Sequence, residues 1–206
     1  MPYGSKRTHF GNQVFDLIDE VYEPAEDTFL FAENLDVREG ERVLDLGTGC
    51  GILGILAAQK ANEVVAVDLN PYAIRCAKEN SAFNGVLFKI AFVQASLFTA
   101  LNPLTVFDLI LFNAPYLPSE EDEASTWIGR SWAGGASGRE VVDSFIVEAP
   151  AYLKPCGRIL LMQSTLTGVN ETLQRFAVQG FTAFVRAERK LPFFETLTLI
   201  EAKLGL

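Results

Sequence analysis

The chain has 206 residues, 49% of them hydrophobic and 21% charged, and a net charge of −9 at pH 7. This length fits one domain built around one core, and a single domain over residues 1–206 is predicted. The acidic balance disfavours a nucleic-acid partner, because a phosphate backbone would be repelled. No apolar stretch reaches the roughly 18 residues that span a bilayer and no signal peptide is recognisable, so a cytoplasmic protein without a membrane segment is expected.

Cysteine and histidine usage disfavours a metal centre. Cys50, Cys76 and Cys156 are widely spaced and include no Cys-x-x-Cys pair, so neither a zinc site nor a disulfide framework is predicted. The single histidine, His9, falls in residues 1–20, which are predicted to form a mobile N-terminal tail ahead of a core at 21–206. A His-dependent catalytic triad and a metal site are therefore not expected.

In chain order, a helical pattern comes first and strand-like and helix-like segments then alternate. Helices are predicted at 24–35, 52–60, 71–83, 139–153 and 169–179, and strands at 42–46, 63–67, 87–94, 107–112, 158–163, 181–186 and 196–201. This alternation predicts an α/β fold with a mostly parallel, seven-stranded sheet and helices on both faces. The last two strands, which no helix separates, are expected to be antiparallel.

The first strand runs into a glycine-rich turn, in the sequence VLDLGTGCG of residues 43–51. Glycines allow a tight turn and let a ligand approach the main chain. Gly49, Gly51 and Gly54 also match a dinucleotide fingerprint, but that fingerprint opens directly after its strand, and this turn opens earlier, at Gly47. Asp45 would repel a pyrophosphate and attract an ammonium group. The pattern favours an amino-acid-bearing cofactor such as S-adenosylmethionine.

The next strand ends at Asp68, in the sequence VVAVDLNP. An acidic residue at the tip of this strand can accept hydrogen bonds from both hydroxyls of a ribose. Asp before Asn-Pro is also a good helix cap. At this distance after the glycine-rich turn, Asp68 fits both a nucleoside-bearing methyl donor and NAD.

The predicted strand 107–112 ends on Asn113, Ala114, Pro115 and Tyr116. These residues resemble the Asn-Pro-Pro-Tyr signature of methyltransferases that alkylate a planar nitrogen. The resemblance implies that the Asn113 side-chain oxygen and the Ala114 carbonyl accept the two hydrogens of the target amine, while Tyr116 packs on its plane. Ala114 replaces a proline of the signature, which keeps the carbonyl but loses the fixed φ angle.

Two further stretches narrow the resemblance. Residues 21–28, VYEPAEDT, and residues 132–141, WAGGASGREV, resemble the HemK-like protein-glutamine methyltransferases, and most of all their short archaeal and eukaryotic branch. This implies a Rossmann-like class I methyltransferase that modifies the glutamine of the Gly-Gly-Gln loop in class I translation release factors. By the same resemblance Thr28 lies by the cofactor, Ser96 stands where an aspartate commonly contacts the adenine amine, and Leu97 packs on the adenine ring.

The expected site therefore has two parts. The S-adenosylmethionine-binding residues are Thr28, Asp45, Gly47, Thr48, Gly49, Gly51, Asp68, Ser96, Leu97 and Asn113, and the catalytic residues are Asn113, Ala114, Pro115 and Tyr116. Four alternatives stay open at this stage. They are an N6-adenine methyltransferase on RNA or DNA, a protein-lysine methyltransferase, an NAD-linked oxidoreductase and a non-catalytic regulatory subunit.

The strand predicted around residues 86–93, VLFKIAFV, carries one charge, Lys89. Class I methyltransferase topology puts it at an edge of the sheet, where free backbone groups recruit other chains. Phe88, Ile90 and Phe92, which occupy every second position, are expected to share one face of the strand. By resemblance to the eukaryotic relative, a small zinc-binding activator is predicted to dock here. Covering by the chain's own helices is the alternative.

Overall fold

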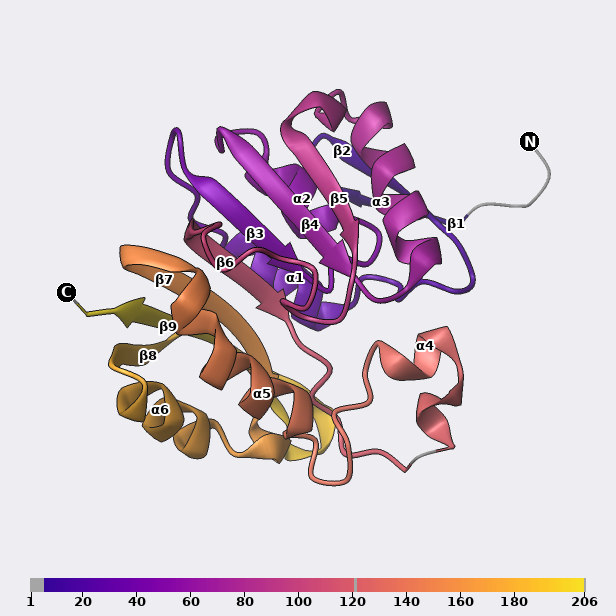
Figure 1. The fold of residues 1–206 in the computed structure, drawn as a ribbon. Coiled ribbons are helices and arrows are strands. Elements are labelled where there is room, and N and C mark those ends of the chain that lie inside the picture. Colours follow the sequence, from indigo (N-terminus) through magenta and orange to yellow (C-terminus); the bar gives the residue numbers. More distant parts are fainter. Residues whose placement is uncertain (1–5, 121, 206) are drawn as a thin grey trace.

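The computed structural model describes residues 6–120 and 122–205. Its centre is a seven-stranded sheet with strand order β5-β4-β3-β6-β7-β9-β8 (Figure 1). The strands are β3 (Arg42–Leu46), β4 (Glu63–Asp68), β5 (Ile90–Gln94), β6 (Phe107–Asn113), β7 (Leu153–Ser164), β8 (Phe181–Lys190) and β9 (Thr196–Leu204). Strands β5, β4, β3, β6 and β7 are parallel, and β9 is antiparallel to both of its neighbours. The predicted mostly parallel, Rossmann-like sheet is confirmed.

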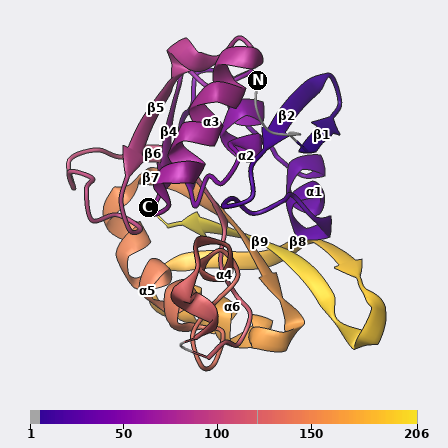
Figure 2. The same ribbon diagram turned by 90° about the vertical axis from the view of Figure 1, so that its right-hand side faces the viewer.

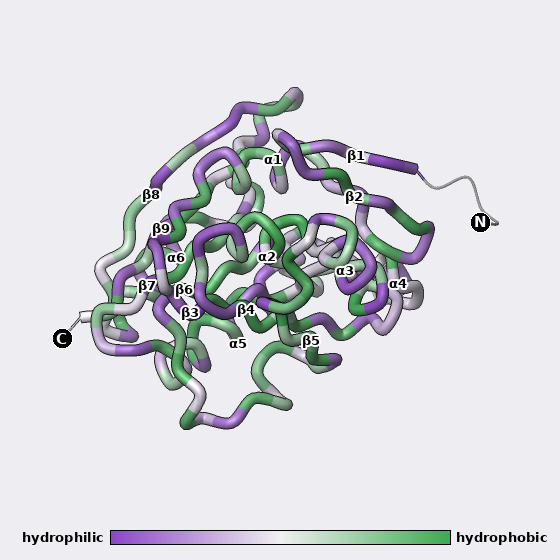
Figure 3. The backbone as a smooth tube through the Cα atoms, turned by 90° about the horizontal axis from the view of Figure 1, so that it is seen from above, coloured by the Kyte–Doolittle hydropathy of each residue, from purple (hydrophilic) through white to green (hydrophobic). Residues whose placement is uncertain are grey.

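Helices cover both faces of this sheet. α1 (Glu26–Glu33), α2 (Ile52–Ala57) and α3 (Pro71–Phe83) pack on one face, and α5 (Glu140–Glu148) and α6 (Val169–Val178) on the other. The two sides form separate apolar cores, because each central strand sends alternate side chains to opposite faces. Figure 3 shows the apolar segments gathered in the middle, with the more polar β1 and β8 at the margin. The short α4 (Trp127–Arg130) lies apart from both layers (Figure 1).

Residues predicted as part of a mobile tail instead form a hairpin of β1 (Lys6–Phe10) and β2 (Gln13–Leu17). A Gly11-Asn12 turn joins the strands, and Gly11 has a φ of +57°. The hairpin is held because Phe15 is fully buried against the main core. Residues 1–5 of the predicted tail lie outside the described part of the chain.

The predicted strand 87–94 is shorter than expected. Residues Leu87–Lys89 form a 3-10 turn, and β5 begins at Ile90. The expectation that Phe88 shares one strand face with Ile90 and Phe92 is therefore wrong, because only the last two lie on the strand. Ile90 is buried, Phe92 is half-buried, and Phe88 is 83% exposed in the turn. The predicted edge position of this strand is confirmed.

The other boundaries moved by a few residues. The helix predicted at 139–153 ends at Glu148 and continues as a 3-10 turn, Ala149–Tyr152, that contains Pro150. β7 then starts at Leu153, five residues before the predicted start, and pairs with both β6 and β9. Among the described residues, no helix has the length and hydropathy needed to cross a membrane.

Candidate active site

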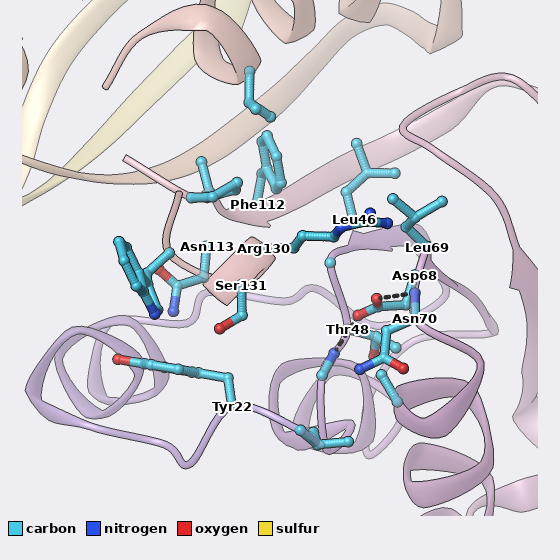
Figure 4. A pocket seen from close by; sticks show the side chains of 18 of the residues that line it. Tyr22, Leu46, Thr48, Asp68, Leu69, Asn70, Phe112, Asn113, Arg130 and Ser131 are labelled. Carbon is cyan, nitrogen blue, oxygen red and sulfur yellow. Dashed lines mark hydrogen bonds between the residues drawn. The ribbon is translucent and has the colours of Figure 1, made fainter. Parts of the chain in front are cut away.

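A cavity of about 590 Å³ opens at the carboxyl ends of β3, β4 and β6. Ligands of open parallel sheets bind at this edge. Figure 4 shows Asp68 and Asn70 at one end of the cavity and Asn113 and Tyr22 at the other, with Arg130 and Ser131 between them. The two ends are called the Asp68 end and the Asn113 end below.

The glycine-rich turn after β3 is held by Asp45, which lies beneath it. The Asp45 carboxyl is buried, and its Oδ2 accepts hydrogen bonds from the Thr48 hydroxyl at 2.6 Å and the Gly54 amide at 2.9 Å. Burial raises the pKa of this carboxyl to about 7, against the lowering effect of the two hydrogen bonds. A Cβ at Gly54 would lie 2.8 Å from Asp45 Oδ2. Gly54 thus serves the packing of α2 against the carboxyl.

Asp68 lies at the tip of β4 and links the end of this strand to the glycine-rich turn after β3. Its Oδ2 accepts a hydrogen bond from the Gly49 amide, and its Oδ1 from the Asn70 amide, both at 2.9 Å. Each carboxyl oxygen can accept a second hydrogen bond. Burial raises the pKa of Asp68, with its amide hydrogen bonds acting in the opposite direction. Asp68 lines the cavity.

At the other end, Asn113 is oriented by residues of α1. Its Nδ2 donates to Asp27 Oδ2 and to Thr28 Oγ1, both at 3.2 Å. The Asn113 Oδ1 is buried and has no hydrogen-bond partner among the described residues. Unpaired buried acceptors are rare in folded proteins. An acceptor held open in this way fits a ligand that brings an N–H group.

Two tyrosines complete the Asn113 end. Tyr116 donates to Asp27 Oδ2 at 3.4 Å, and Tyr22 donates to Asp27 Oδ1 at 3.2 Å. Burial, and then the charge of Asp27, raise the pKa of both hydroxyls well above their usual range. Both therefore stay protonated and act as hydrogen-bond donors. Asp27 is 6% exposed and collects these bonds together with that of Asn113.

The loop after β6 is fixed by the glycine-rich stretch at 132–138. Leu117 N donates to Trp132 O at 2.9 Å, and Gly134 N donates back to Leu117 O at 2.8 Å. A Cβ at Gly138, which has a φ of +73°, would lie 2.6 Å from Tyr116 O. Gly138 therefore lets the backbone approach the Tyr116 loop closely.

The structure brings most of the predicted site residues to this one cavity. Its lining includes Thr28, Gly47, Thr48, Gly49, Asp68, Ser96, Leu97, Asn113, Ala114, Pro115 and Tyr116. Asp45 and Gly51 do not line it. Asp45 supports the turn from below. Gly51, with a φ of +89°, is the N-cap residue of α2, and a Cβ there would lie 3.0 Å from Ala77 Cβ. The roles assigned to single residues remain predictions.

Several lining residues were not assigned from the sequence. Tyr22 and Asp27 lie inside the VYEPAEDT stretch, of which only Thr28 was given a role. Trp127 and Arg130 come from α4, which was not predicted. A four-residue helix capped by the Thr126 hydroxyl, which accepts from Gly129 N at 3.0 Å, is too short to leave a helical periodicity in the sequence.

A seven-stranded sheet of this order with β9 antiparallel, a glycine-rich turn after β3, an acidic end of β4 and an amide at the end of β6 are the features of a class I methyltransferase. The family model described as "Methyltransferase small domain" matches residues 24–129. The chain belongs to this family of methyltransferases, among the protein N5-glutamine methyltransferases and HEMK2 proteins. This decides against the oxidoreductase and regulatory-subunit alternatives.

Curated relatives cover nearly the whole chain. A protein of Methanocaldococcus jannaschii named as a protein N5-glutamine methyltransferase is 43% identical over 182 residues, which are 87% of this chain and 90% of the relative. The human methyltransferase HEMK2 is 32% identical over 207 residues, 94% of this chain and 92% of the relative. A release factor glutamine methyltransferase of Deinococcus radiodurans is 38% identical over 139 residues, 64% of this chain and 49% of the relative.

Solved structures agree with this assignment. The structure of the E. cuniculi Mtq2-Trm112 complex, which methylates the eRF1 translation termination factor, contains a chain with a TM-score of 0.73 and 27% identity. The match covers 90% of this chain and 99% of that chain. An M. jannaschii tRNA m1G37 methyltransferase has a TM-score of 0.74 at 17% identity, covering 100% of this chain and 58% of that one, which shows the fold alone.

Proposed function

We propose that the protein uses S-adenosylmethionine to methylate the glutamine side chain in the Gly-Gly-Gln loop of a translation release factor. The observation that carries the proposal is Asn113, whose amide nitrogen is held by Asp27 and Thr28 while its oxygen has no partner within residues 6–120 and 122–205. Such an acceptor matches an N–H of a carboxamide. The names of the M. jannaschii and D. radiodurans relatives support glutamine as the acceptor.

The Asp68 end fits the cofactor. Gly47 and Gly49 have φ values of +64° and +55°, and a Cβ at Gly49 would meet nothing within 4 Å, so main chain faces open space at the turn. Asp68 keeps free lone pairs beside these glycines for two ribose hydroxyls. Ser96 and Leu97 line the same cavity and would lie against the adenine. When bound, S-adenosylmethionine supplies an electrophilic methyl group.

The chain's own contribution at the Asn113 end is positioning. Asn113 Oδ1 and the Ala114 carbonyl would each accept one N–H of the target amide, and the Tyr116 ring would pack on its plane. These bonds localise the lone pair on the nitrogen and fix its direction. No base with a special pKa is required, because the nitrogen becomes acidic once it carries the methyl group. Asp27 orients Asn113 by accepting a hydrogen bond from its amide nitrogen.

The test is transfer of a tritiated methyl group from S-adenosylmethionine to a purified release factor of the archaeal type, with total RNA and DNA as competitors. We expect label on the Gly-Gly-Gln glutamine, and none after Asn113→Ala although that variant binds the cofactor within a few-fold. Label on RNA, DNA or lysine would instead select the adenine or lysine alternative. Asp68→Ala should weaken cofactor binding by about 30- to 150-fold in calorimetry, which corresponds to about 2–3 kcal/mol.

The departure at Ala114 can be tested separately. Ala114 is buried at the end of β6, and only its carbonyl is assigned a role in binding the target. Ala114→Pro should therefore keep activity, since proline supplies the same carbonyl and fixes φ. A folded but inactive Ala114→Pro protein would contradict the assignment of the carbonyl.

We also propose that a small zinc-binding protein covers the edge of β5. Among the described residues strand β5 pairs with β4 alone, and the turn that precedes it presents Phe88 at 83% exposure and Leu87 at 38%. Unpaired backbone groups beside exposed apolar side chains form a site for strand addition. The presence of Trm112 in the Mtq2 complex supports a partner of this kind.

A further inference from the structure

The tip of the β8–β9 hairpin presents two adjacent aromatic side chains to solvent. Phe193 is 95% exposed and Phe194 is 102% exposed, in a short turn, Pro192–Phe194, between the strands. Figures 2 and 3 both show this hairpin projecting beyond the body of the molecule near α1. Burial of a phenylalanine side chain is stabilising, so a fully exposed pair indicates a surface that another molecule covers.

The backbone of these two residues is also strained. Phe193 and Phe194 have φ values of +62° and +67°. Glycine adopts this left-handed region freely and asparagine tolerates it, whereas a phenylalanine there is destabilising. The same turn could be closed at lower cost by other residues. Since neither side chain is buried against any part of the chain that the structure describes, the strain indicates that these side chains act outside the fold.

The base of the tip is fixed in place. Leu191 packs against the main core, and its amide donates to Glu195 O at 2.8 Å, which closes the turn. Arg189 forms ion pairs with Glu26 and Glu33 of α1, both at 2.7 Å. Since α1 also carries the side chains that orient Asn113, the hairpin and the Asn113 end share one support.

The tip lies at the same end of the sheet as the cavity, the end formed by the carboxyl ends of the parallel strands. β9 is antiparallel to β7, and β7 is parallel to β6, so the turn between β8 and β9 stands at the carboxyl end of β6, where Asn113 lies. Burial, and then the carboxylates of Asp27 and Glu195, raise the pKa of the Tyr116 hydroxyl. Glu195 is therefore within electrostatic range of the Asn113 end.

We infer that the Phe193–Phe194 tip docks on the protein that carries the methyl-accepting glutamine. This inference rests on the proposed function and names a second contact for its substrate. When a glutamine of a protein substrate enters the cavity, the substrate surface around that glutamine lies over this end of the sheet, within reach of the projecting hairpin. The expected counterpart is an apolar depression beside the Gly-Gly-Gln loop, because two aromatic anchors in a pocket supply much of the binding free energy of an interface.

The test compares the wild type with the double variant Phe193→Asn, Phe194→Gly. Both new residues suit the left-handed turn, so the variant should unfold at the same temperature as the wild type or higher. With the intact release factor we expect KM to rise about 10- to 100-fold with little change in kcat. With a short Gly-Gly-Gln peptide, and for cofactor affinity, we expect agreement within about two-fold, because neither reaches the tip.

Leu104→Ser is the matched control. Leu104 is 87% exposed and precedes β6, at the opposite edge of the sheet, so its loss should leave KM for the release factor unchanged. An unchanged KM for the double variant would overturn the docking assignment. So would an equal loss on the peptide, or a wild-type dimer or vesicle binding that the variant abolishes. Absence of transfer by the wild type on the release factor would refute the proposed function itself, and the docking site with it.

Discussion

Asp27 shows how one buried side chain can set the orientation of several others. Its Oδ1 accepts from Tyr22 and from the Thr28 amide, at 3.2 and 2.6 Å, and its Oδ2 accepts from Asn113 and Tyr116, at 3.2 and 3.4 Å. A carboxyl with two acceptor oxygens can hold donors on both sides, whereas an amide cannot. Asp27 therefore determines which atom of Asn113 remains free.

Asp27→Asn should lower kcat about 100-fold and leave cofactor affinity within a few-fold. The new amide nitrogen would face the Asn113 nitrogen, and Asn113 would turn its oxygen away from the target to relieve that contact. Steady-state kinetics with the release factor and calorimetry with the cofactor measure the two effects. Glu39→Gln, which changes an exposed carboxylate in the loop after α1 and outside the cavity, is the control. A kcat unaffected by Asp27→Asn would mean that Asn113 is oriented by Thr28 alone.

Asp45 should make the stability of the protein depend on pH. Burial raises the pKa of its carboxyl to about 7 in the folded state, whereas an unfolded aspartate titrates near 3.9. The folded state therefore holds a proton that the unfolded state has lost between these values. The stabilisation is fully present below about pH 4 and is lost as the pH rises through about 7.

The matched variant is Asp45→Asn, whose amide oxygen can accept from Thr48 and Gly54 without titrating. From pH 4 to 7.5, the wild type should lose stability relative to the variant by up to about 4 kcal/mol. Urea unfolding of both proteins at several pH values measures this difference, because the carboxyls that do not interact with Asp45 contribute equally in the two; Asp68 is the neighbour that does interact with it. A difference that stays constant with pH would show that Asp45 is already ionised near pH 4.

At the scale of single elements, the N-terminal hairpin is the main part of the fold that was predicted wrongly. Its sequence, KRTHF-GN-QVFDL, has the two-residue turn of a β-hairpin, so a usable signal was present. What the sequence does not show is its anchor. Asn80 of α3 bonds both the amide and the carbonyl of Asp16, and also Cys50 O in the glycine-rich turn.

Asn80→Ala should destabilise the protein by about 2–4 kcal/mol, because it removes the side-chain partner of the buried Cys50 carbonyl and of the half-buried Asp16 amide and carbonyl. Since the lost bonds join β2 to the rest, hydrogen exchange should accelerate most at the Asp16 amide. Denaturant unfolding and amide exchange measure the two effects. Glu79→Ala, an exposed change on the same helix, should have neither. Uniform acceleration across the sheet would argue against a specific tether.

At the scale of the whole molecule, the fold brings residues from segments far apart in the sequence into one cavity, and most of these residues were predicted from the sequence. The strand ends at Asp68 and Asn113 could be located because alternating strands and helices fix the direction of a parallel sheet. Side-chain orientation could not be predicted. Asp45 points beneath its loop and Asp27 points toward β6. Both orientations depend on partners that lie more than five residues away or in another element, which a local sequence pattern does not reveal.

The exposed edge of β5 leads us to predict how the protein assembles with a partner. Phe88 stands outside the strand in the 3-10 turn and is 83% exposed, whereas Phe92 is half-buried and packs against the core. A charge at Phe88 should therefore block a partner without disturbing the fold. Co-expression with a Trm112-like protein should give a heterodimer for the wild type and for Val178→Glu, an exposed change on α6. Phe88→Glu should give monomer with unchanged cofactor affinity. A Phe88→Glu protein that still forms the heterodimer, or a wild type that is fully active and monodisperse alone, would place the partner elsewhere or remove the need for one.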